Sequence, residues 1–244
     1  MTTTRHAVVL SGVPVTVRPL RRLPQLFAGL VLYGASDGLL VRAHLGLDPW
    51  DVLHEGVSKR LGVDFGSVVA VVGVLVLLAW IPLRQRPGVG TVANVAVVAL
   101  SVDAVLALVT QPGSLLARIV LLVSGVVLNG LATAGYIGAR LGPGPRDGLM
   151  TGLTARTGWS IRLVRTGIEL TVLACGWLLG GTVGVGTVLY AVGIGPLTQL
   201  FLPLVVWRGP GDRPDRATEP SQEGPADRVG QADQAASRRA RNSA

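Results

Sequence analysis

The sequence predicts an all-α polytopic membrane protein made of two copies of one three-helix unit. The first observation is composition: 49% of the residues are hydrophobic and only 15% are charged, with a mean hydropathy of +0.53. Such a chain is too apolar for an ordinary soluble domain. The second is that its apolar residues form runs close to the ~20 residues that a membrane-spanning helix needs. The third is an internal repeat.

The repeat appears when the sequence is shifted by 96 positions. Gly-Val-Gly-Thr-Val at 88–92 recurs at 184–188, and the pattern Leu-Gly-x-x-Pro-x-Asp-x-Leu-x-x-Gly-x-x-x-Arg-x-Gly at 45–62 recurs at 141–158. Roughly three in ten positions of 27–109 match 123–205 without a gap. A repeat dictates architecture, so it organises everything that follows.

Each copy contains three apolar runs, and only helices or closed barrels satisfy their backbone hydrogen bonds within lipid. We therefore predict six transmembrane helices, at 26–43, 67–83, 91–110, 115–139, 163–179 and 187–207. The repeated Gly-Val-Gly-Thr is interpreted as a tight turn in which Thr91 and Thr187 cap the third helix of each copy.

A short amphipathic segment follows the first span of each copy. In the first copy Asp48 is the predicted N-cap, Pro49 occupies the first turn, and Gly62 ends the helix. Its apolar face is predicted to comprise Trp50, Leu53, Val57 and Leu61. In the second copy Gly144, Pro145 and Gly158 take the same places, and Ser160 restarts the chain as a cap. About 14 residues at ~1.5 Å each fall short of a ~30 Å hydrocarbon layer, so these helices are interfacial or re-entrant.

Basic residues are unevenly distributed between the two sides of the membrane. The larger set is Arg18, Arg21, Arg22, Arg84, Arg86, Arg140, Arg146, Arg156, Arg162 and Arg208; the smaller is Arg42, Lys59, Arg60 and Arg118. By the positive-inside rule both termini are cytoplasmic. Three spans per copy would invert the second copy about an axis in the membrane plane, as in many transporters. If the short connectors also cross, the two copies become parallel instead.

The expected organisation is thus a flexible cytoplasmic N-terminus at 1–22, membrane repeats at 23–110 and 111–208, and a disordered cytoplasmic tail at 209–244. The tail is rich in Pro, Gly, Asp, Arg and Gln, which cannot build a core.

The connectors also carry a family resemblance. Leu-Gly-Pro-Gly-Pro-Arg-Asp-Gly-Leu-Met at 141–150 and Leu-Asp-Pro-Trp-Asp-Val-Leu-His at 47–54 resemble the YczE/YitT-like family of bacterial integral membrane proteins, over about 26–207. The absence of a soluble C-terminal domain favours the YczE-like branch. The resemblance implies a multi-pass bacterial plasma-membrane protein with a duplicated unit, and it implies no reaction.

Five charged residues are candidates for a substrate or ion path. Asp51 and Asp147 begin the two connectors with Arg146 beside the second, while Asp37 and Asp103 lie inside spans, where charges are costly. The structural alternatives are helix capping for Asp51 and Asp147, and interhelical bonding for Asp37 and Asp103. Arg42 is a candidate cation for Asp103. Glu169 is expected to pair internally with Arg165, four residues earlier on the same helix.

Other classes of function are disfavoured. Three histidines and one cysteine form no ligand cluster, and no nucleophile motif stands out, so we expect neither an enzyme nor a metal or other cofactor. No compact basic domain suggests nucleic-acid binding. Two hypotheses remain: a transporter for a small solute or ion, with its path between the repeats, or a non-transporting scaffold or regulator of a partner complex. A homo-oligomer or a protein partner is left open beside the lipid bilayer.

Overall fold

The computed structural model describes residues 14–207, which form eight α-helices and, within that range, no strand. The helices are α1 Pro19–Ala43, α2 Pro49–Leu61, α3 Phe65–Leu83, α4 Val89–Leu108, α5 Leu115–Gly138, α6 Pro145–Thr157, α7 Ile161–Leu178 and α8 Val185–Val205. The expected tail at 209–244 and most of the expected N-terminal lead lie outside the described residues. Residues 19–22, expected in that lead, are the first turn of α1.

Five of the six predicted spans are long and apolar enough to cross a membrane: α1, α3, α4, α5 and α8. The sixth, α7, is a helix of 18 residues that includes Arg162, Arg165 and Glu169. These three charges lower its apolar character, so a sixth span stays a prediction. The all-helical membrane architecture is confirmed.

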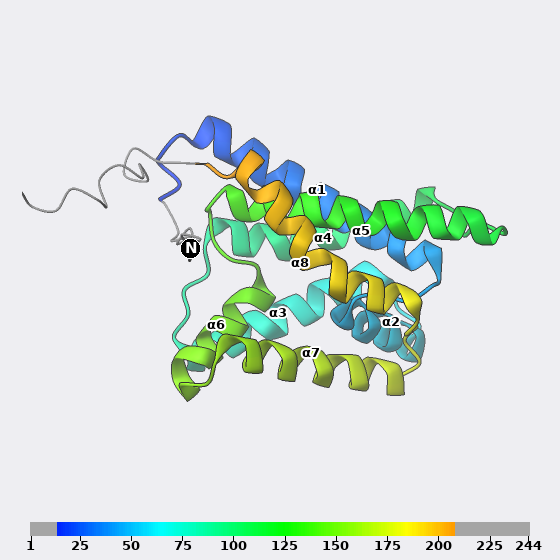
Figure 1. The fold of residues 1–244 in the computed structure, drawn as a ribbon. Helices are drawn as coiled ribbons and strands as arrows, with labels where there is room; N and C mark the ends of the chain where they lie inside the picture. Colours follow the sequence, from blue (N-terminus) through cyan, green and yellow to red (C-terminus); the bar gives the residue numbers. More distant parts are fainter. Residues whose placement is uncertain (1–13, 208–244) are drawn as a thin grey trace, which may run out of the picture. The chain divides into compact units, whose positions relative to one another are not determined.

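The helices lie in two groups (Figure 1). In one group α1 packs between α4 and α5, and α8 packs against α5. In the other group α2 packs on α7 and α3, and α6 packs on α3 and α7. A contact between α3 and α4 joins the groups, whereas α7 and α8 share at most a marginal contact. The two groups are therefore in contact on the side of α3 and α4, which we call the closed side, and separated on the side of α7 and α8.

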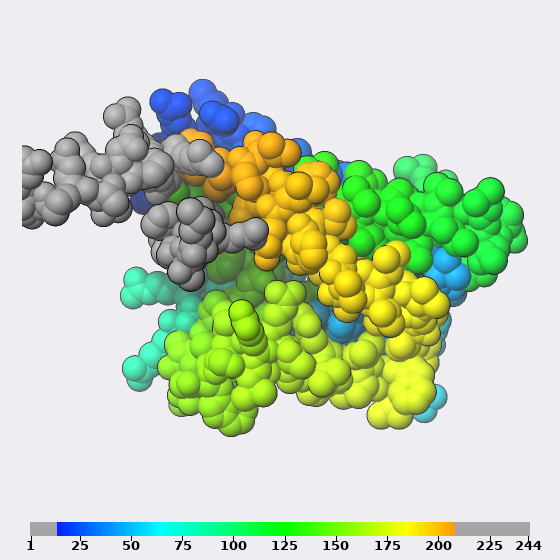
Figure 2. All heavy atoms as spheres, in the orientation of Figure 1, coloured from blue at the N-terminus to red at the C-terminus, as the bar shows by residue number. Residues whose placement is uncertain are grey.

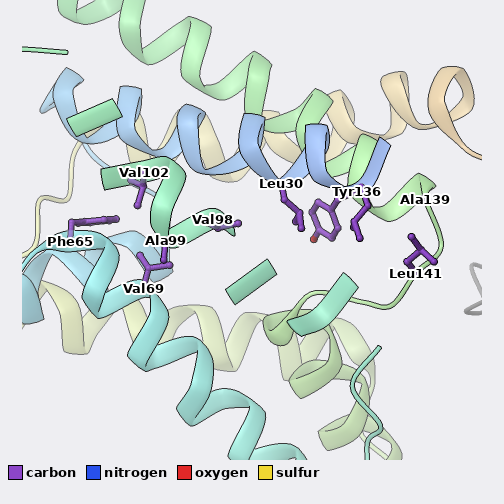
Figure 3. Packing of buried hydrophobic residues seen from close by; sticks show 10 residues of the cluster. Leu30, Phe65, Val69, Val98, Ala99, Val102, Tyr136, Ala139 and Leu141 are labelled. Atoms are coloured by element: carbon purple, nitrogen blue, oxygen red, sulfur yellow. The ribbon is translucent and has the colours of Figure 1, made fainter. Parts of the chain in front are cut away.

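An apolar cluster fills the closed side, between α1, α3, α4 and the end of α5 (Figure 3). Leu30 and Val102 are fully buried there, and Phe65 and Val69 of α3 belong to the same cluster. Burial of aliphatic and aromatic side chains at this junction stabilises the α3–α4 contact.

Helices α1 and α5 run antiparallel, and each carries an arginine that caps the end of the other. Arg22, near the start of α1, donates from Nε to the Ala139 carbonyl (2.9 Å) and from Nη2 to the Arg140 carbonyl (2.9 Å), just past α5. Arg118, near the start of α5, donates in the same way to the carbonyls of Ala43 and His44 at the end of α1. These guanidinium groups satisfy carbonyls that a helix C-terminus leaves without partners.

The 96-residue shift relates many other contacts. The Gly90 N–H donates to Leu141 O (3.0 Å) and the Gly186 N–H donates to Leu45 O (2.7 Å). The same correspondence holds for the tight turns, in which the hydroxyls of Thr91 and Thr187 accept the N–H groups of the glycines three residues earlier. The capping predicted for both threonines is confirmed.

A complementary exchange of side-chain size marks one pair of equivalent contacts. At one contact a Cβ on Gly148 would collide with the Trp80 ring; at the other a Cβ on Gly176 would collide with the backbone of Val52 and Leu53. Positions 52 and 148, and 80 and 176, are 96 apart. In the first contact the long helix α3 carries the large residue, Trp80. In the second contact the equivalent position of α7 is Gly176.

The ends of the connectors are as predicted, but the buried face of α2 is not. Asp48 caps α2 through its carboxylate, and Gly62 and Gly158 end α2 and α6 with positive φ. Ser160 caps α7, while the side chain of Asp64 makes no capping hydrogen bond. Leu61, predicted for the apolar buried face of α2, is 68% exposed. The face that α2 buries includes Asp51, His54 and Glu55, because a polar site lies beneath it.

Candidate functional site

The N-termini of α2 and α6 meet at the centre of the described chain. The Arg146 guanidinium of α6 lies over the Trp50 ring of α2, 5.1 Å from its centroid. Both residues follow a proline in the first turn, so the local sequence that opens each helix also presents these two side chains to each other. A stacked guanidinium gains cation–π attraction when it is withdrawn from water.

Arg146 also joins two carboxyl groups of α2. Its Nη1 lies 3.4 Å from Asp48 Oδ1, and its Nη2 lies 3.5 Å from Asp51 Oδ1. His54 Nδ1 lies 3.0 Å from the same Asp51 oxygen. Asp48, Asp51 and His54 are all at least 98% buried. The start of α6 is therefore tied to a buried polar face of α2.

A third carboxylate comes from α1. Asp37 is buried, and its Oδ1 accepts a hydrogen bond from Asn129 Nδ2 of α5 at 2.8 Å. Asn129 Nδ2 also donates to Ser36 Oγ (2.9 Å), and Asn129 Oδ1 accepts from the Tyr190 hydroxyl of α8 (2.9 Å). Asp37, Asp48 and Asp51 each offer one oxygen within 4.8 Å of the others. Four elements thus meet around three acids, which we call the carboxylate cluster.

Oxygen atoms of this kind suit hard cations, so the carboxylate cluster is the group that could hold a metal ion or a proton. Arg146 already lies against two of its three members, which disfavours a second fixed positive charge at the same oxygens. The remaining path candidate, Asp147, is separate: its Oδ2 accepts from the Tyr136 hydroxyl at 3.1 Å.

A cavity of about 130 Å³ adjoins these residues. It is comparable to cavities of roughly 150 Å³ that hold benzene. The surface between α8 and α7 is hollowed in Figure 2, on the side where these helices are parted. All three tyrosines of the chain line the cavity, with Trp50, Asp48, Arg146 and Asp147, and the hydrogen-bonded pair Arg165–Glu169 lines it from α7. A small solute with polar groups fits such a lining.

Burial sets the protonation of the groups on α2 and α6. Burial, followed by the charge of Asp51, raises the pKa of Asp48 to about 7. Burial also raises the pKa of Asp51, against the opposing effect of Arg146. His54 is neutral, because burial and then Arg146 lower its pKa to about 3. For Arg146 burial disfavours the charge, but Tyr33 and the nearby carboxyl groups outweigh it and raise the pKa well above its ordinary value.

The structure brings four of the five predicted path residues to this region and places the fifth elsewhere. Asp37, Asp51, Arg146 and Asp147 lie at or beside the cavity. Asp103 does not line the cavity: its Oδ1 accepts the Gly66 N–H at 2.7 Å, at the start of α3. Arg42, the candidate cation for Asp103, donates to the Leu106 carbonyl instead. Arg165 and Glu169 form the expected pair, at 2.9 Å.

Several site residues were not predicted. The sequence marks Asp48 only as a helix cap, and it singles out neither His54 nor Asn129 as part of a site. The three tyrosines of the chain, all of which line the cavity, were not predicted as site residues either.

Comparison with known proteins places this architecture in a family. The sequence profile of a family described as "Family of unknown function (DUF6198)" matches residues 20–203, from the start of α1 to the end of α8. The chain belongs to this family. The match covers both connectors and every described helix almost completely, so the family is defined by the membrane region.

Individual relatives agree with this assignment. An uncharacterized protein of Haemophilus influenzae is 41% identical over 180 residues, covering 74% of this chain and 82% of the relative. The uncharacterized membrane protein YczE of Bacillus subtilis is 34% identical over 183 residues, covering 72% and 83%, and the uncharacterized protein YyaS of the same organism is 27% identical over 181 residues, covering 72% and 90%. No solved structure matches. The YczE-like resemblance is confirmed, and this is a membrane protein with several apolar helices.

Proposed function

We propose that this DUF6198 family member is a transporter for a small solute or ion, with its path between two inverted repeats. The position of the cavity carries the proposal. Eight pairs of its lining residues are 96 positions apart: 48 and 144, 49 and 145, 50 and 146, 54 and 150, 69 and 165, 73 and 169, 94 and 190, and 98 and 194. The cavity therefore lies where equivalent parts of the two halves face each other, as substrate sites do in transporters with internal repeats.

The antiparallel arrangement of α1 and α5 supports inversion. These helices are equivalent in the repeat, and each begins where the other ends, with Arg22 and Arg118 in matching capping roles. Inversion would place the ends of α2 and α6 on opposite sides of the bilayer, with both termini cytoplasmic in a bacterial plasma membrane. The solute passes without chemical change, so the proposal is of a transporter and not of an enzyme.

The unequal packing of equivalent helices supports a path that opens on one side at a time. The α3–α4 contact is closed, whereas its equivalent between α7 and α8 is parted, and the cavity lies beside that opening. Exchanging the two arrangements would close α7 on α8 and part α3 from α4. Such an exchange would expose the same cavity to the opposite side, which is alternating access.

Water accessibility tests the proposal. In a Cys175→Ser background, Asn94→Cys places a thiol on the cavity wall from α4, and Leu100→Cys, 73% exposed on the same helix, places one toward lipid. A membrane-impermeant thiol reagent is expected to label position 94 and to leave position 100 unlabelled. If neither position reacts from either side, the path fails, and the scaffold or regulator hypothesis is favoured.

A further inference from the structure

The carboxylate cluster contains more negative charge than the surrounding residues compensate. Asp37, Asp48 and Asp51 are all buried, and within the described residues Arg146 is the one cation that ion pairs link to them. His54 touches Asp51 but is neutral. Two negative charges would remain if all three acids were ionised, and uncompensated charge in a buried site is strongly unfavourable.

Two oxygen atoms of the cluster also lack partners. Asp48 Oδ2 and Asp51 Oδ2 are buried, and neither accepts a hydrogen bond from any residue that the structure describes. Asp48 and Asp51 each offer one oxygen within 4.8 Å of the other, and a side-chain hydrogen bond between them is among the causes that shift both pKa values. A hydrogen bond between two carboxyl groups requires a proton on one of them, because a carboxylate only accepts. A single proton on the pair would supply a donor that both carboxylates lack and remove one negative charge.

The pair and Asp37 differ in their hydrogen bonds. Asp37 Oδ1 accepts a hydrogen bond from Asn129 Nδ2, whereas Asp48 Oδ2 and Asp51 Oδ2 have no donor among the described residues. The titratable and charged groups that face the pair from all sides are Tyr33 and Asp37 of α1, His54 and Glu55 of α2, Arg146 of α6 and Tyr190 of α8. Arg146 is the one cation in this set, and its contact with both acids disfavours a metal ion there.

We propose that Asp48 and Asp51 form a proton-binding site that holds one shared proton, and that this proton is the ion coupled to transport. The coupling rests on the proposed function; the shared proton does not. Asp48 lines the cavity, so its carboxyl group adjoins the space that a solute would occupy. Loss of the proton would strengthen the hold of the acids on Arg146, the residue that joins α6 to α2. Proton release and movement of one connector against the other are thereby linked.

Infrared difference spectroscopy on the full chain in lipid nanodiscs tests the site directly. The carbonyl stretch of a protonated carboxylic acid is followed from about pH 5 to about pH 9. The expected result is an acid signal that disappears as the pH rises through neutrality, is lost in Asp48→Asn and is shifted in Asp51→Asn. Asp64→Asn, at an exposed position, is the matched control and should leave the signal unchanged.

Several results would overturn the proton site. One is the lack of any protonated carboxyl group near neutral pH; another is a signal that persists unchanged in both Asp48→Asn and Asp51→Asn. Displacement of the wild-type signal by Mg²⁺ or Mn²⁺ would assign the cluster to a metal ion instead. If Asp48→Asn does not fold, the test uses Asp51→Asn and the wild-type protein in deuterated solvent, in which the band of a protonated carboxyl group shifts. The two proposals can fail separately. If the acid signal is present but Asn94→Cys in the cavity is not labelled, the shared proton is kept and the transport path is rejected.

Discussion

Arg146 lies over the ring of Trp50, 5.1 Å from its centroid, and the two residues occupy equivalent positions 96 apart in the sequence. If an axis relates the two halves, Trp50 and Arg146 are equivalent residues that face each other across it. Because one is a cation and the other an aromatic ring, the contact is attractive and asymmetric. Each of the two residues follows the proline in the first turn of its helix, α2 or α6.

Removing the Arg146 charge should destabilise the protein. Arg146→Ala leaves the carboxylate cluster without its cation. Both acids are buried but Arg146 is 24% exposed, so the loss should lie at or below the roughly 3–5 kcal/mol of breaking a fully buried ion pair. The double variant Arg146→Ala/Asp51→Asn also removes one of the unpaired negative charges, so it should recover part of the lost stability. Thermal unfolding of the purified variants in detergent measures both; equal stability of the single and double variants would contradict the charge balance described for the cluster.

The stability advantage of wild type over Asp48→Asn should fall as the pH rises. The pKa of Asp48 is raised from 3.8 in the unfolded chain to about 7 in the folded protein, so between these values the folded state holds a proton that the unfolded state does not. The Asp48 contribution is therefore full below pH 3.8 and is lost by about pH 7. Unfolding temperatures of both proteins at about pH 5 and about pH 7 measure it. A constant difference would exclude the raised pKa.

His54 has the opposite pH dependence, so it provides a control on the sign. Burial lowers its pKa from 6.5 to about 3, and in this window the unfolded chain binds the extra proton. Stability from the neutral His54 is therefore full above about pH 6.5 and declines as the pH falls toward 3. The advantage of wild type over His54→Gln should increase from about pH 4 to about pH 6.5, measured by the same unfolding experiment. A decrease would mean that the folded protein holds His54 charged.

The size exchange at positions 80 and 148 predicts a rescue. Gly148→Val should be severely destabilising, because its Cβ collides with Trp80, and overpacking of this kind costs about 1–3 kcal/mol or more. Adding Trp80→Gly removes the ring that the new side chain would meet and gives position 80 the glycine found at position 176. The two substitutions should therefore couple favourably, by at least about 1 kcal/mol in a double-mutant cycle. Additive effects would show that the equivalence of the two contacts is incidental.

Arg22 and Arg118 should respond alike to substitution. Arg22→Ala leaves the carbonyls of Ala139 and Arg140 without this donor, and Arg118→Ala does the same at Ala43 and His44. Each unsatisfied buried group costs about 1–3 kcal/mol, so each variant should lose a few kcal/mol of unfolding free energy. Arg22 is fully buried and should show the larger loss. Denaturant unfolding compares them; an undiminished Arg22→Ala would exclude the capping role.

Local features of the fold were predictable because neighbouring residues determine them. The proline-led starts of α2 and α6, the glycine ends and the threonine-capped turns follow from backbone conformations that those residue types favour. The apolar spans follow from composition. The prediction of α7 as a span is the one that is not confirmed. Its Arg165 and Glu169 line a polar cavity that the sequence alone does not indicate.

The carboxylate cluster could be predicted only in part, because its members come from elements far apart in the sequence. The periodicity of α2 marks Trp50, Leu53, Val57 and Leu61 as its apolar face, and a helix normally buries such a face. Trp50 is buried as predicted, but Leu61 is exposed, and the buried side of α2 also carries Asp51, His54 and Glu55. Arg146 of α6 and Thr182, which precedes α8, supply partners for Asp51 and Glu55. The two capping arginines were assigned to opposite loops on charge alone, although their 96-residue spacing was a signal that the repeat offered.

The sidedness of the two connector ends in the membrane decides whether the two repeats are inverted. Val63 and Trp159 are equivalent, both are exposed, and each follows the glycine that ends its connector. In a Cys175→Ser background, Val63→Cys and Trp159→Cys are probed in intact cells and in inverted membrane vesicles with an impermeant thiol reagent. If the repeats are inverted, Val63→Cys and Trp159→Cys are labelled from opposite sides of the membrane. Labelling of both positions from the same side would contradict inversion.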